Sequence, residues 1–327
     1  MSKNIFVWLL GIFLLTTAST ARAQQPKILQ VGVLTLGSPQ LPQIEGLRAG
    51  LKEAGYVEKK TLVLDIAAKE TYEELRPIAK AYVEKKLDVI VALGSTAPLL
   101  AKALTETIPI VFVGASDPIA SGLVKSLARP EANVTGVARA TDLEMQGKRL
   151  EIFKDAVPSS RRVAVLFNAR GENPLHAESL KLLHKVAPAL GLKLIEKPVK
   201  SPADIDRTLS TISKDSTDGL FIICASIFRD SLKKLADFAL GKRLPLSTCG
   251  ARHVSDDGAL LNYGADDYRL GLRGAWYVDR ILKGAKPAEL PVEQPTKFEF
   301  VINLKTAKQI GLTIPPNVLA RADRVIR

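Results

Sequence analysis

The feature that most constrains the fold is a regular alternation of apolar, strand-like runs with amphipathic helical stretches, and it occurs twice along the chain. In the first series, strands are predicted at residues 28–36, 62–67, 89–93 and 110–113, with helices between them at residues 41–54, 73–84 and 96–105. Strands that alternate with helices indicate βαβ units and therefore a parallel sheet.

The second series repeats this pattern. Strands are predicted at residues 163–167, 194–198, 219–224, 246–249 and 259–262, with helices at residues 176–190, 203–213 and 228–240. Ser201 and Pro202 open one of these helices as a cap followed by proline at the first helical position. A long helix at residues 266–283, a strand at 298–302 and a short helix at 305–310 complete the prediction.

Two similar halves of this length exceed one comfortable hydrophobic core. We therefore expect an α/β protein with two doubly wound parallel-sheet lobes joined by a hinge. Residues 24–138 plus about 265–297 are predicted to form lobe 1, and residues 139–264 plus about 298–327 to form lobe 2. The link between the halves lies at residues 133–141, where 134–138 is a candidate strand end. A cleft between hinged lobes is the expected place for a ligand.

Residues 1–23 are interpreted as a cleaved secretory signal peptide. Lys3 precedes an apolar run from residue 5 to about residue 18, and Ala21-Arg22-Ala23 follows as the cleavage site. A membrane anchor is the alternative, but the run is shorter than the roughly 20 apolar residues that span a bilayer. No Cys follows the run, which argues against a lipoprotein. We expect a periplasmic protein that begins at Gln24.

The formal net charge of +12 raises the question of nucleic-acid binding. The predicted export and the scattered positions of the basic residues favour a solvated surface instead, with no nucleic acid as partner. Cys224 and Cys249 are the only cysteines, and their spacing matches no zinc pattern. We expect two buried free thiols, with a single disulfide as the alternative in an oxidising periplasm.

The ligand-binding residues are expected in the loops that follow the strands, because ligands of open parallel sheets sit outside the carboxyl ends of the strands. These loops are short, small and hydroxylated, and glycine lets a backbone approach a ligand closely. The candidate ligand-binding residues are Ser38, Gly94, Ser95, Thr96, Ser116, Asp117, Asn168, Ala225, Ser226, Cys249 and Tyr263.

Two of these loops have predicted roles. Ser95 and Thr96 open a helix, so their hydroxyl and backbone N–H groups suit an anionic group of the ligand, and Asp117 suits a polar or cationic group. Each position also has a structural alternative: Ser95 or Thr96 as a helix N-cap, Asp117 before Pro118 as a turn, and Asn168 as support of its own loop. The functional interpretation depends on the convergence of these loops at one edge of each sheet.

Signatures of catalysis are missing from the sequence. It contains no G-x-S-x-G, H-E-x-x-H or P-loop motif. His176 and His184 lie on one predicted helix among polar neighbours, which indicates a surface helix rather than a metal site, and His253 lies in a loop. Asp266 and Asp267 are interpreted as the start of a helix. We expect a protein that is not an enzyme and has no metal and no cofactor.

Several segments resemble a large bacterial family. They are GLRAGLKEAGYV at residues 46–57, TIPIVF at 107–112, SDP at 116–118, LARP and NVTG within 127–136, KRLE at 148–151, ILKGAKP at 281–287, LPVEQPTKF at 290–298, and INLKTAK and GLTIP within 302–315. Over nearly its whole length after residue 23, the chain is similar to the ABC transporter substrate-binding protein family, whose characterised members include tryptophan- and phenylalanine-binding TrpX-type proteins.

The resemblance implies a type I periplasmic binding protein, with strand order 2-1-3-4-5 in each lobe and three crossings between the lobes. It implies that the protein captures a small organic solute, such as an amino acid or an aromatic acid, for an ABC permease and ATPase of the inner membrane. We expect a monomer. Family members often carry Asp in the loop after the third strand of the second lobe, but residues 224–228 contain no acid. This difference weakens the transfer of an amino-acid ligand, although Asp117 can supply a partner for an ammonium group. A periplasmic ligand-sensing protein that feeds a membrane receptor is the alternative function.

Overall fold

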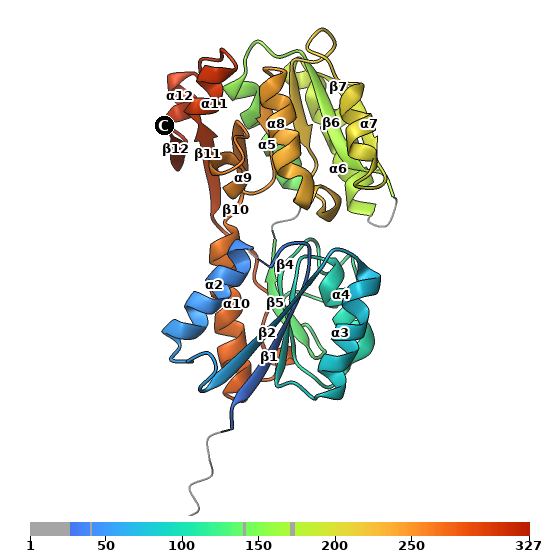
Figure 1. Ribbon diagram of the computed structural model, residues 1–327, viewed down its shortest axis with the longest axis vertical. Helices are drawn as coiled ribbons and strands as arrows, with labels where there is room; N and C mark the ends of the chain where they lie inside the picture. The colour runs from blue at the N-terminus through green and yellow to red at the C-terminus, as the bar shows by residue number, and fades with distance from the viewer. Residues whose placement is uncertain (1–26, 40, 140–141, 171–173) are drawn as a thin grey trace, which may run out of the picture.

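The computed structural model describes residues 27–39, 41–139, 142–170 and 174–327 and shows two α/β lobes that meet at a narrow junction (Figure 1). The predicted signal peptide at residues 1–23 lies outside the described residues. Among the described helices, none combines the length and the apolar character that crossing a bilayer requires. Each lobe is built around its own sheet.

The first sheet has the strand order β2-β1-β3-β4-β5, and all of its pairs are parallel. Its strands are β1 (Leu29–Leu36), β2 (Leu62–Lys69), β3 (Val89–Leu93), β4 (Ile110–Ala115) and β5 (Val134–Ala138). β3, β4 and β5 are buried along their whole length, as expected for a parallel sheet that is covered on both faces. The predicted order is confirmed, and the candidate strand end at residues 134–138 is a complete strand.

Helices cover both faces of this sheet. α2 (Pro42–Glu53) and α10 (Asp267–Leu282) lie on one face, and α3 (Tyr72–Glu84) and α4 (Thr96–Leu104) lie on the other (Figure 1). A separate apolar core fills the space under each helix pair. The loops at the ends of the strands are therefore carried by a sheet that is held from both sides.

The second sheet has the order β7-β6-β8-β9-β10-β11-β12. Its strands are β6 (Arg162–Asn168), β7 (Lys193–Val199), β8 (Gly219–Ile222), β9 (Leu246–Ser247), β10 (Leu261–Ala265), β11 (Phe298–Asn303) and β12 (Arg324–Ile326). The strands from β7 to β10 follow the predicted order 2-1-3-4-5. β11 then pairs antiparallel to β10, and β12 pairs parallel to β11, so the C-terminal segment extends the sheet.

Helices also cover this sheet, and an apolar core lies on each face. They are α5 (Asp142–Ala156), α6 (Pro174–Val186), α7 (Asp204–Ser210), α8 (Leu232–Gly241), α9 (Arg252–Ser255), α11 (Leu304–Gln309) and α12 (Pro316–Leu319). Short 3₁₀ turns occur at η1 (Ala187–Leu190), η2 (Ser226–Ser231) and η3 (Pro287–Glu289).

Helix α5, which follows the first crossing between the lobes, is not predicted by the sequence pattern. Gln146 and Arg149 are buried on this helix beside Leu150 and Phe153. Polar residues therefore interrupt the apolar stripe by which an amphipathic helix is identified. β8 and β9 are also shorter than predicted, because the chain leaves the sheet early at the edge that faces the other lobe.

The chain passes between the lobes from β5 to α5, from β10 to α10, and from η3 to β11. The last of these segments is tied to the first lobe through Glu293, whose backbone bonds to Gly136 and Ala138 of β5. Arg273 of α10 donates two hydrogen bonds to the Glu293 carboxylate, and these hold the pKa of Glu293 below its usual value. Tyr277 donates to the Pro291 carbonyl at 2.5 Å. α10 is thus the element that fastens this crossing.

The backbones of α2 and α10 touch, which requires glycine at the contact. A Cβ on Gly46 would lie 2.0 Å from Tyr268 O, and a Cβ on Gly271 would lie 2.1 Å from Gln43 O. Neither glycine has a positive φ, so the lack of space rather than the backbone conformation excludes a side chain. The start of α10, which follows β10 of the other lobe, is therefore held at a fixed place against α2.

Gly46→Ala should destabilise the protein because the added methyl group would push α2 and α10 apart. Overpacking of this kind costs about 1–3 kcal/mol, and urea unfolding measures the loss. Gly241→Ala is the matched control, since Gly241 ends α8 and a Cβ there would have no neighbour within 4 Å. We expect the control to be neutral or stabilising by up to about 1 kcal/mol. An equal loss in both variants would contradict the close helix contact.

Candidate functional site

A small hollow lies where the strand ends of the second sheet meet the segments that cross between the lobes. Its walls come from the end of β5, from α5, from the loops after β8 and β9, and from β10. About 30 Å³ is open to a water-sized sphere, so the hollow has room for only part of a ligand. The polar and aromatic residues that line it are Arg139, Gln146, Arg149, Asn262 and Tyr263.

Arg149 places a buried cation in the wall of this hollow. The residue is 2% exposed, and its guanidinium donates to Gln146 Oε1 (2.8 Å), the Ile222 carbonyl (3.0 Å) and the Thr248 carbonyl (2.9 Å). It also lies over the Phe221 ring, 4.7 Å from the centroid. A charge at such depth requires hydrogen bonds of this kind. Because Ile222 ends β8 and Thr248 follows β9, Arg149 ties both strand ends to α5.

Cys224 and Cys249 form a disulfide, so the expectation of two buried free thiols was wrong. β8 and β9 are parallel neighbours, with Phe221 beside Ser247, and the residues that follow them emerge at the same edge of the sheet. The two Cα atoms are 5.6 Å apart, within the range that a disulfide spans. The bond closes the wall of the hollow beside the strand ends that Arg149 holds.

Asn262 of β10 presents a buried amide to the hollow. Its Oδ1 accepts a hydrogen bond from Gly250 N at 2.9 Å, which identifies the other amide atom as Nδ2. The residue is 1% exposed, and within the described residues Nδ2 has no hydrogen-bond partner. A buried N–H group without a partner is unfavourable. The wall of the hollow therefore includes a residue with a buried, unpaired donor.

Arg139 extends from the end of β5 and pairs with the first residue of α10. Its guanidinium donates to Asp267 Oδ1, and Gln43 Nε2 of α2 donates to the same oxygen at 2.8 Å. The Arg139 and Asp267 side chains are 26% and 20% exposed, so the pair is shielded from solvent in large part. This cluster holds the first and second crossings together at the border of the hollow.

Tyr263 brings an aromatic ring to the hollow. Its ring centroid lies 5.8 Å from that of Phe298 and 6.3 Å from that of Phe300, both on the antiparallel neighbour β11. These tilted and edge-to-face arrangements are the ones that aromatic pairs favour. Tyr263 is half-buried, so part of its surface remains accessible at the lobe junction.

In the first lobe, the predicted loops after β3 and β4 lie side by side. Ser116 N donates to Ser95 Oγ at 3.0 Å, so the Ser95 side chain joins the two loops and makes no N-cap bond to α4. Gly94 has a φ of 75°, and Thr96 is exposed. None of these four residues lines the hollow described above, and their contact with a ligand stays a prediction.

Asp117 adopts a φ of 32°, and its Oδ1 accepts from Ala120 N at 2.9 Å. One carboxylate oxygen thus supports its own turn, which is the structural alternative considered for this residue. Ser38 is half-buried in the loop after β1. A ligand contact by Asp117 or by Ser38 stays a prediction.

In the second lobe, Asn168 is 8% exposed and accepts from Arg170 N at 3.0 Å, so its amide supports its own loop. Ala225 is half-buried and precedes η2, and the side chain of Ser226 lies outside the described residues. Cys249 belongs to the disulfide. Of the residues predicted from the sequence, Tyr263 lines the hollow directly.

The sequence analysis missed Arg139, Gln146, Arg149 and Asn262 as site residues. Two signals pointed toward them. Arg149 lies in the KRLE segment that carries part of the family resemblance, and Asn262 stands next to Tyr263 at the end of a predicted strand. The burial of Arg149 and Gln146 had no signal of its own, because Arg and Gln side chains are mostly exposed in proteins.

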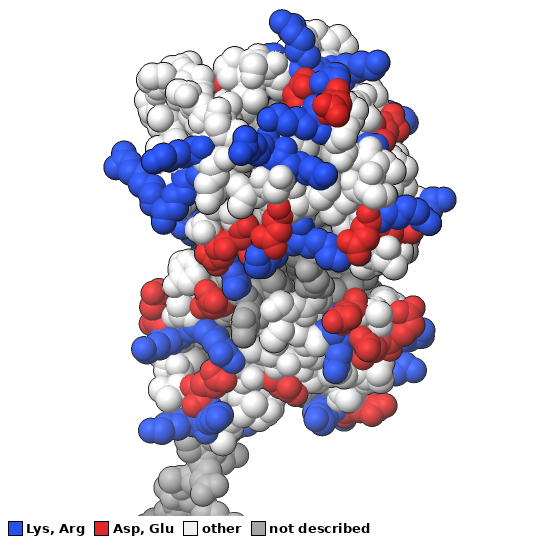
Figure 2. Space-filling view, turned by 45° about the horizontal axis from the view of Figure 1, so that its top comes forward, with Lys and Arg blue, Asp and Glu red and all other residues white. Residues whose placement is uncertain are grey.

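Charged side chains of both signs are mixed over the face in Figure 2, including the junction of the lobes. Nucleic-acid binding would require a basic patch or stripe instead. In the described part of the chain, no group of three or more His, Cys, Asp or Glu side chains is placed to hold a metal ion.

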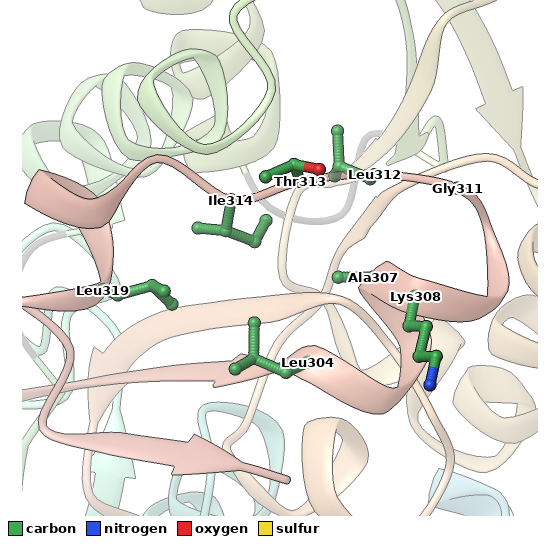
Figure 3. Close-up of a pocket in the computed structure, with 8 residues that line it drawn as sticks. All are labelled: Leu304, Ala307, Lys308, Gly311, Leu312, Thr313, Ile314 and Leu319. Carbon is green, nitrogen blue, oxygen red and sulfur yellow. The ribbon is translucent and has the colours of Figure 1, made fainter.

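A second hollow, of about 480 Å³, lies at the C-terminal end of the second lobe. Figure 3 shows Leu304, Ile314 and Leu319 around it. These side chains belong to or pack against the apolar core of that lobe. Its lining is mainly apolar, with Lys308 and Thr313 as the polar side chains. A ligand site normally has several polar groups that converge on the ligand. We therefore place the functional site at the smaller hollow, at the strand ends.

Comparison with known proteins identifies the family. A family model described as ABC transporter substrate binding protein matches residues 31–326, which is nearly all of the described chain. The strand orders of both sheets and the place of the hollow fit this match.

Three relatives are similar over most of their length. A conserved domain protein from Vibrio cholerae has a crystal structure with a TM-score of 0.81 at 31% identity, covering 91% of this chain and 100% of that one. A Streptococcus pneumoniae ABC domain in complex with L-Trp has a TM-score of 0.80 at 24% identity, covering 92% and 100%. A protein of Clostridioides difficile (strain R20291), named tyrosine-binding protein, is 25% identical over 270 residues, covering 82% of this chain and 76% of that protein.

Replacing both cysteines with serine should destabilise the second lobe. The disulfide joins positions 25 residues apart, and closing a loop of this size contributes about 3 kcal/mol. A reductant should lower the melting temperature of the natural protein and leave the Cys224→Ser/Cys249→Ser variant unchanged, which makes the variant its own control. Two reactive thiols in the unreduced, denatured protein would contradict the assignment.

Proposed function

Because the chain belongs to the ABC transporter substrate-binding protein family, we propose that it captures a small organic solute between its lobes and delivers it to an ABC importer. The partners would be a permease and an ATPase of the inner membrane. The family consists of solute-binding proteins and not of enzymes. The proposed solute is an amino acid, an aromatic acid or a similar compound.

One observation carries the proposal: Asn262 lines the hollow, and its buried Nδ2 has no partner among the described residues. An acceptor on a bound solute would remove the cost of leaving this donor unpaired. Arg139 and Arg149 line the same hollow. Donors and positive charge at one place favour a carboxylate as the group that binds there.

The aromatic part of the proposal rests on Tyr263 and on one relative. The Tyr263 ring borders the same hollow as the donors, and rings stack on one another in offset or edge-to-face geometry. The similar protein from Clostridioides difficile is named for binding tyrosine. An aromatic amino acid or acid would place its carboxylate at Asn262 and Arg149 and its ring toward Tyr263.

Closure of the lobes would complete the site. The hollow is too small for a whole aromatic solute, so the remaining contacts would come from the other lobe. The proposed lobes are residues 24–138 with about 265–297, and residues 139–264 with about 298–327. On closure, Ser95, Thr96 and Asp117 of the first lobe would approach the solute from the opposite side.

Ligand binding should be detectable by thermal shift with a panel of L-tyrosine, L-tryptophan, L-phenylalanine and simple aromatic acids. A ligand at 100 times its dissociation constant stabilises the folded protein by about 2.7 kcal/mol. Small-angle scattering should show a smaller radius of gyration with the same ligand. A saturating ligand that leaves the radius unchanged would argue against closure, and a panel without any stabilising member would refute the proposed solute class.

Asn262→Asp tests the site itself. The aspartate keeps an oxygen for Gly250 N but replaces the donor with a second oxygen, which would repel a carboxylate. We expect calorimetry to show at least a tenfold weaker affinity, since an unpaired buried polar group costs about 1–3 kcal/mol. Asn303→Asp is the matched control, because Asn303 is similarly buried, also accepts a backbone N–H and is not a candidate ligand-binding residue. Equal losses in the two variants would remove the reason to place the solute at Asn262.

We further propose that the protein is periplasmic and monomeric. The disulfide supports an oxidising compartment, because disulfides persist there and are rare in the cytosol. The Ala21-Arg22-Ala23 segment supports export through a cleaved signal peptide.

N-terminal analysis of the protein from the periplasm of its host should read from Gln24. Cleavage after Ala23 is expected because small residues occupy both positions that the signal peptidase reads. An Ala21→Leu/Ala23→Leu variant should keep its leader and serve as the control. Recovery of the natural full-length chain from the cytoplasm would contradict the export proposal.

A further inference from the structure

His253 lies next to the hollow, and a carboxylate fixes the orientation of its ring. The Nδ1–H group donates to Asp257 Oδ2 at 2.5 Å. Because a carboxylate only accepts, the neutral ring has its proton on Nδ1 and its lone pair on Nε2. The two side chains are 23% and 17% exposed. In the neutral ring, Nε2 is therefore an acceptor whose direction is set by the protein.

Two acceptors, one from each side of the junction, approach a single point above Gly250. Gly250 has a φ of 96° and lines the hollow. A Cβ built on it would lie 3.9 Å from His253 Nε2 and 3.8 Å from Asp267 Oδ2. His253 belongs to α9, which packs in the second lobe, whereas Asp267 begins α10 on the first sheet.

The structural role of Asp267 accounts for only one of its oxygens. Oδ1 accepts from Gln43 and from Arg139, and the neighbouring Asp266 caps the start of α10 through Tyr268 N and Arg269 N. Over the residues that the structure describes, Oδ2 accepts no hydrogen bond. Helix capping and the ion pair therefore leave the oxygen that faces Gly250 unexplained.

We infer that Asp267 Oδ2 and His253 Nε2 bind the ammonium group of the solute, so that the solute is an α-amino acid and not a plain organic acid. This inference rests on the proposed function and specifies its ligand. An ammonium group has three donors and no acceptor, and the point above Gly250 offers a carboxylate oxygen and an imidazole lone pair. The carboxylate of the same molecule would bind at Asn262 and Arg149 in the same hollow.

Asp117, the acid that the sequence analysis predicts for a cationic group, is less well placed. Its Oδ1 is taken by Ala120 N. Neither Asp117 nor Asp267 lines the hollow directly, so the distance to Gly250, which does line it, distinguishes them. Asp267 lies within 4 Å of a point on the wall of the hollow itself. The two carboxylates thus make different predictions for the same experiment.

The test compares each amino acid with its analogue that lacks the amino group. Calorimetry on the full-length mature protein would measure L-tyrosine against deamino-tyrosine, and L-tryptophan against deamino-tryptophan. A charge-assisted hydrogen bond corresponds to an affinity difference of about 10- to 100-fold. We expect the natural protein to prefer the amino acid by this factor in the pair that it binds.

Variants then locate the ammonium site. Asp267→Asn should reduce the preference to within a few fold, and His253→Phe, which keeps a ring but loses both nitrogens, should reduce it in part. Asp266→Asn is the matched control, because Asp266 stands next to Asp267 and caps the start of α10, and it should retain the full preference. Asp117→Asn tests the competing carboxylate, and the inference predicts that it also retains the preference. A change that only loosened the fold would weaken both members of a pair alike, so the ratio of affinities separates recognition from structural damage.

Each outcome decides the inference. Equal affinity of the natural protein for both members of a pair would overturn it while leaving the proposed solute binding intact. An unchanged preference in both Asp267→Asn and His253→Phe, or its loss in Asp117→Asn, would move the ammonium site elsewhere. Binding of neither pair would overturn the inference together with the proposed aromatic solute.

Discussion

The backbone contact between α2 and α10 is the constraint on which the rest of the site depends. α10 receives the chain from β10 in one lobe and packs in the other, so its first turn belongs to the junction. The contact at Gly46 and Gly271 leaves no room for a side chain, and the position of α10 therefore has little freedom. Asp267 sits on that first turn, and the pairs that α10 makes with Arg139 and Glu293 hold two other crossing segments against it. In the proposed closure, the lobes would move while the first lobe keeps its part of the candidate site unchanged.

The second lobe builds its part of the site by a different means. The strands β8 and β9 are short and end early, and their ends are joined twice, by the Cys224–Cys249 disulfide and by the guanidinium of Arg149. A buried cation is costly in an apolar interior, and carbonyl oxygens at strand ends are well suited to offset that cost because they have no partner further along the sheet. The same group that organises these loops also supplies positive charge to the hollow. In the proposed site one side chain would serve both structure and recognition, and Arg149 would then be a poor target for separating the two roles.

The polar groups around the hollow form two sets: hydrogen-bond donors, which suit a negatively charged group, and acceptors, which suit a positively charged group. Asn262 and the two guanidinium groups offer donors, whereas Asp267 Oδ2 and His253 Nε2 offer acceptors on the side of Gly250. An amino acid carries both complements within one small molecule. Because the acceptors come from opposite sides of the junction, a ligand that engaged both would favour a closed arrangement of the lobes. Differential contact of this kind is what a solute must provide in order to shift a hinge equilibrium.

Sequence alone determined the layered architecture. The β-branched runs and the helical spacing predicted both series of βαβ units, and the order 2-1-3-4-5 came from the family resemblance and is present in both sheets. The same reasoning predicted the ligand at the strand ends, where Tyr263 lines the hollow, because the local pattern shows where a strand ends. It missed α5, since Gln146 and Arg149 interrupt the apolar stripe, and it expected free thiols where a disulfide forms.

Tertiary structure decided what depends on register and on distant segments. The pairing of Cys224 with Cys249 follows from the alignment of β8 with β9, which no single-strand pattern contains. The burial of Arg149 depends on carbonyl groups that lie 73 and 99 residues away along the chain. From the sequence, Asp267 was interpreted as an ordinary helix start. Its closeness to Gly250 and His253 arises only when α10 is packed on α2. The local pattern of a segment specifies whether it forms a helix or a strand. Which polar groups meet at a site depends on contacts between distant segments, and the pattern of a single segment does not contain that information.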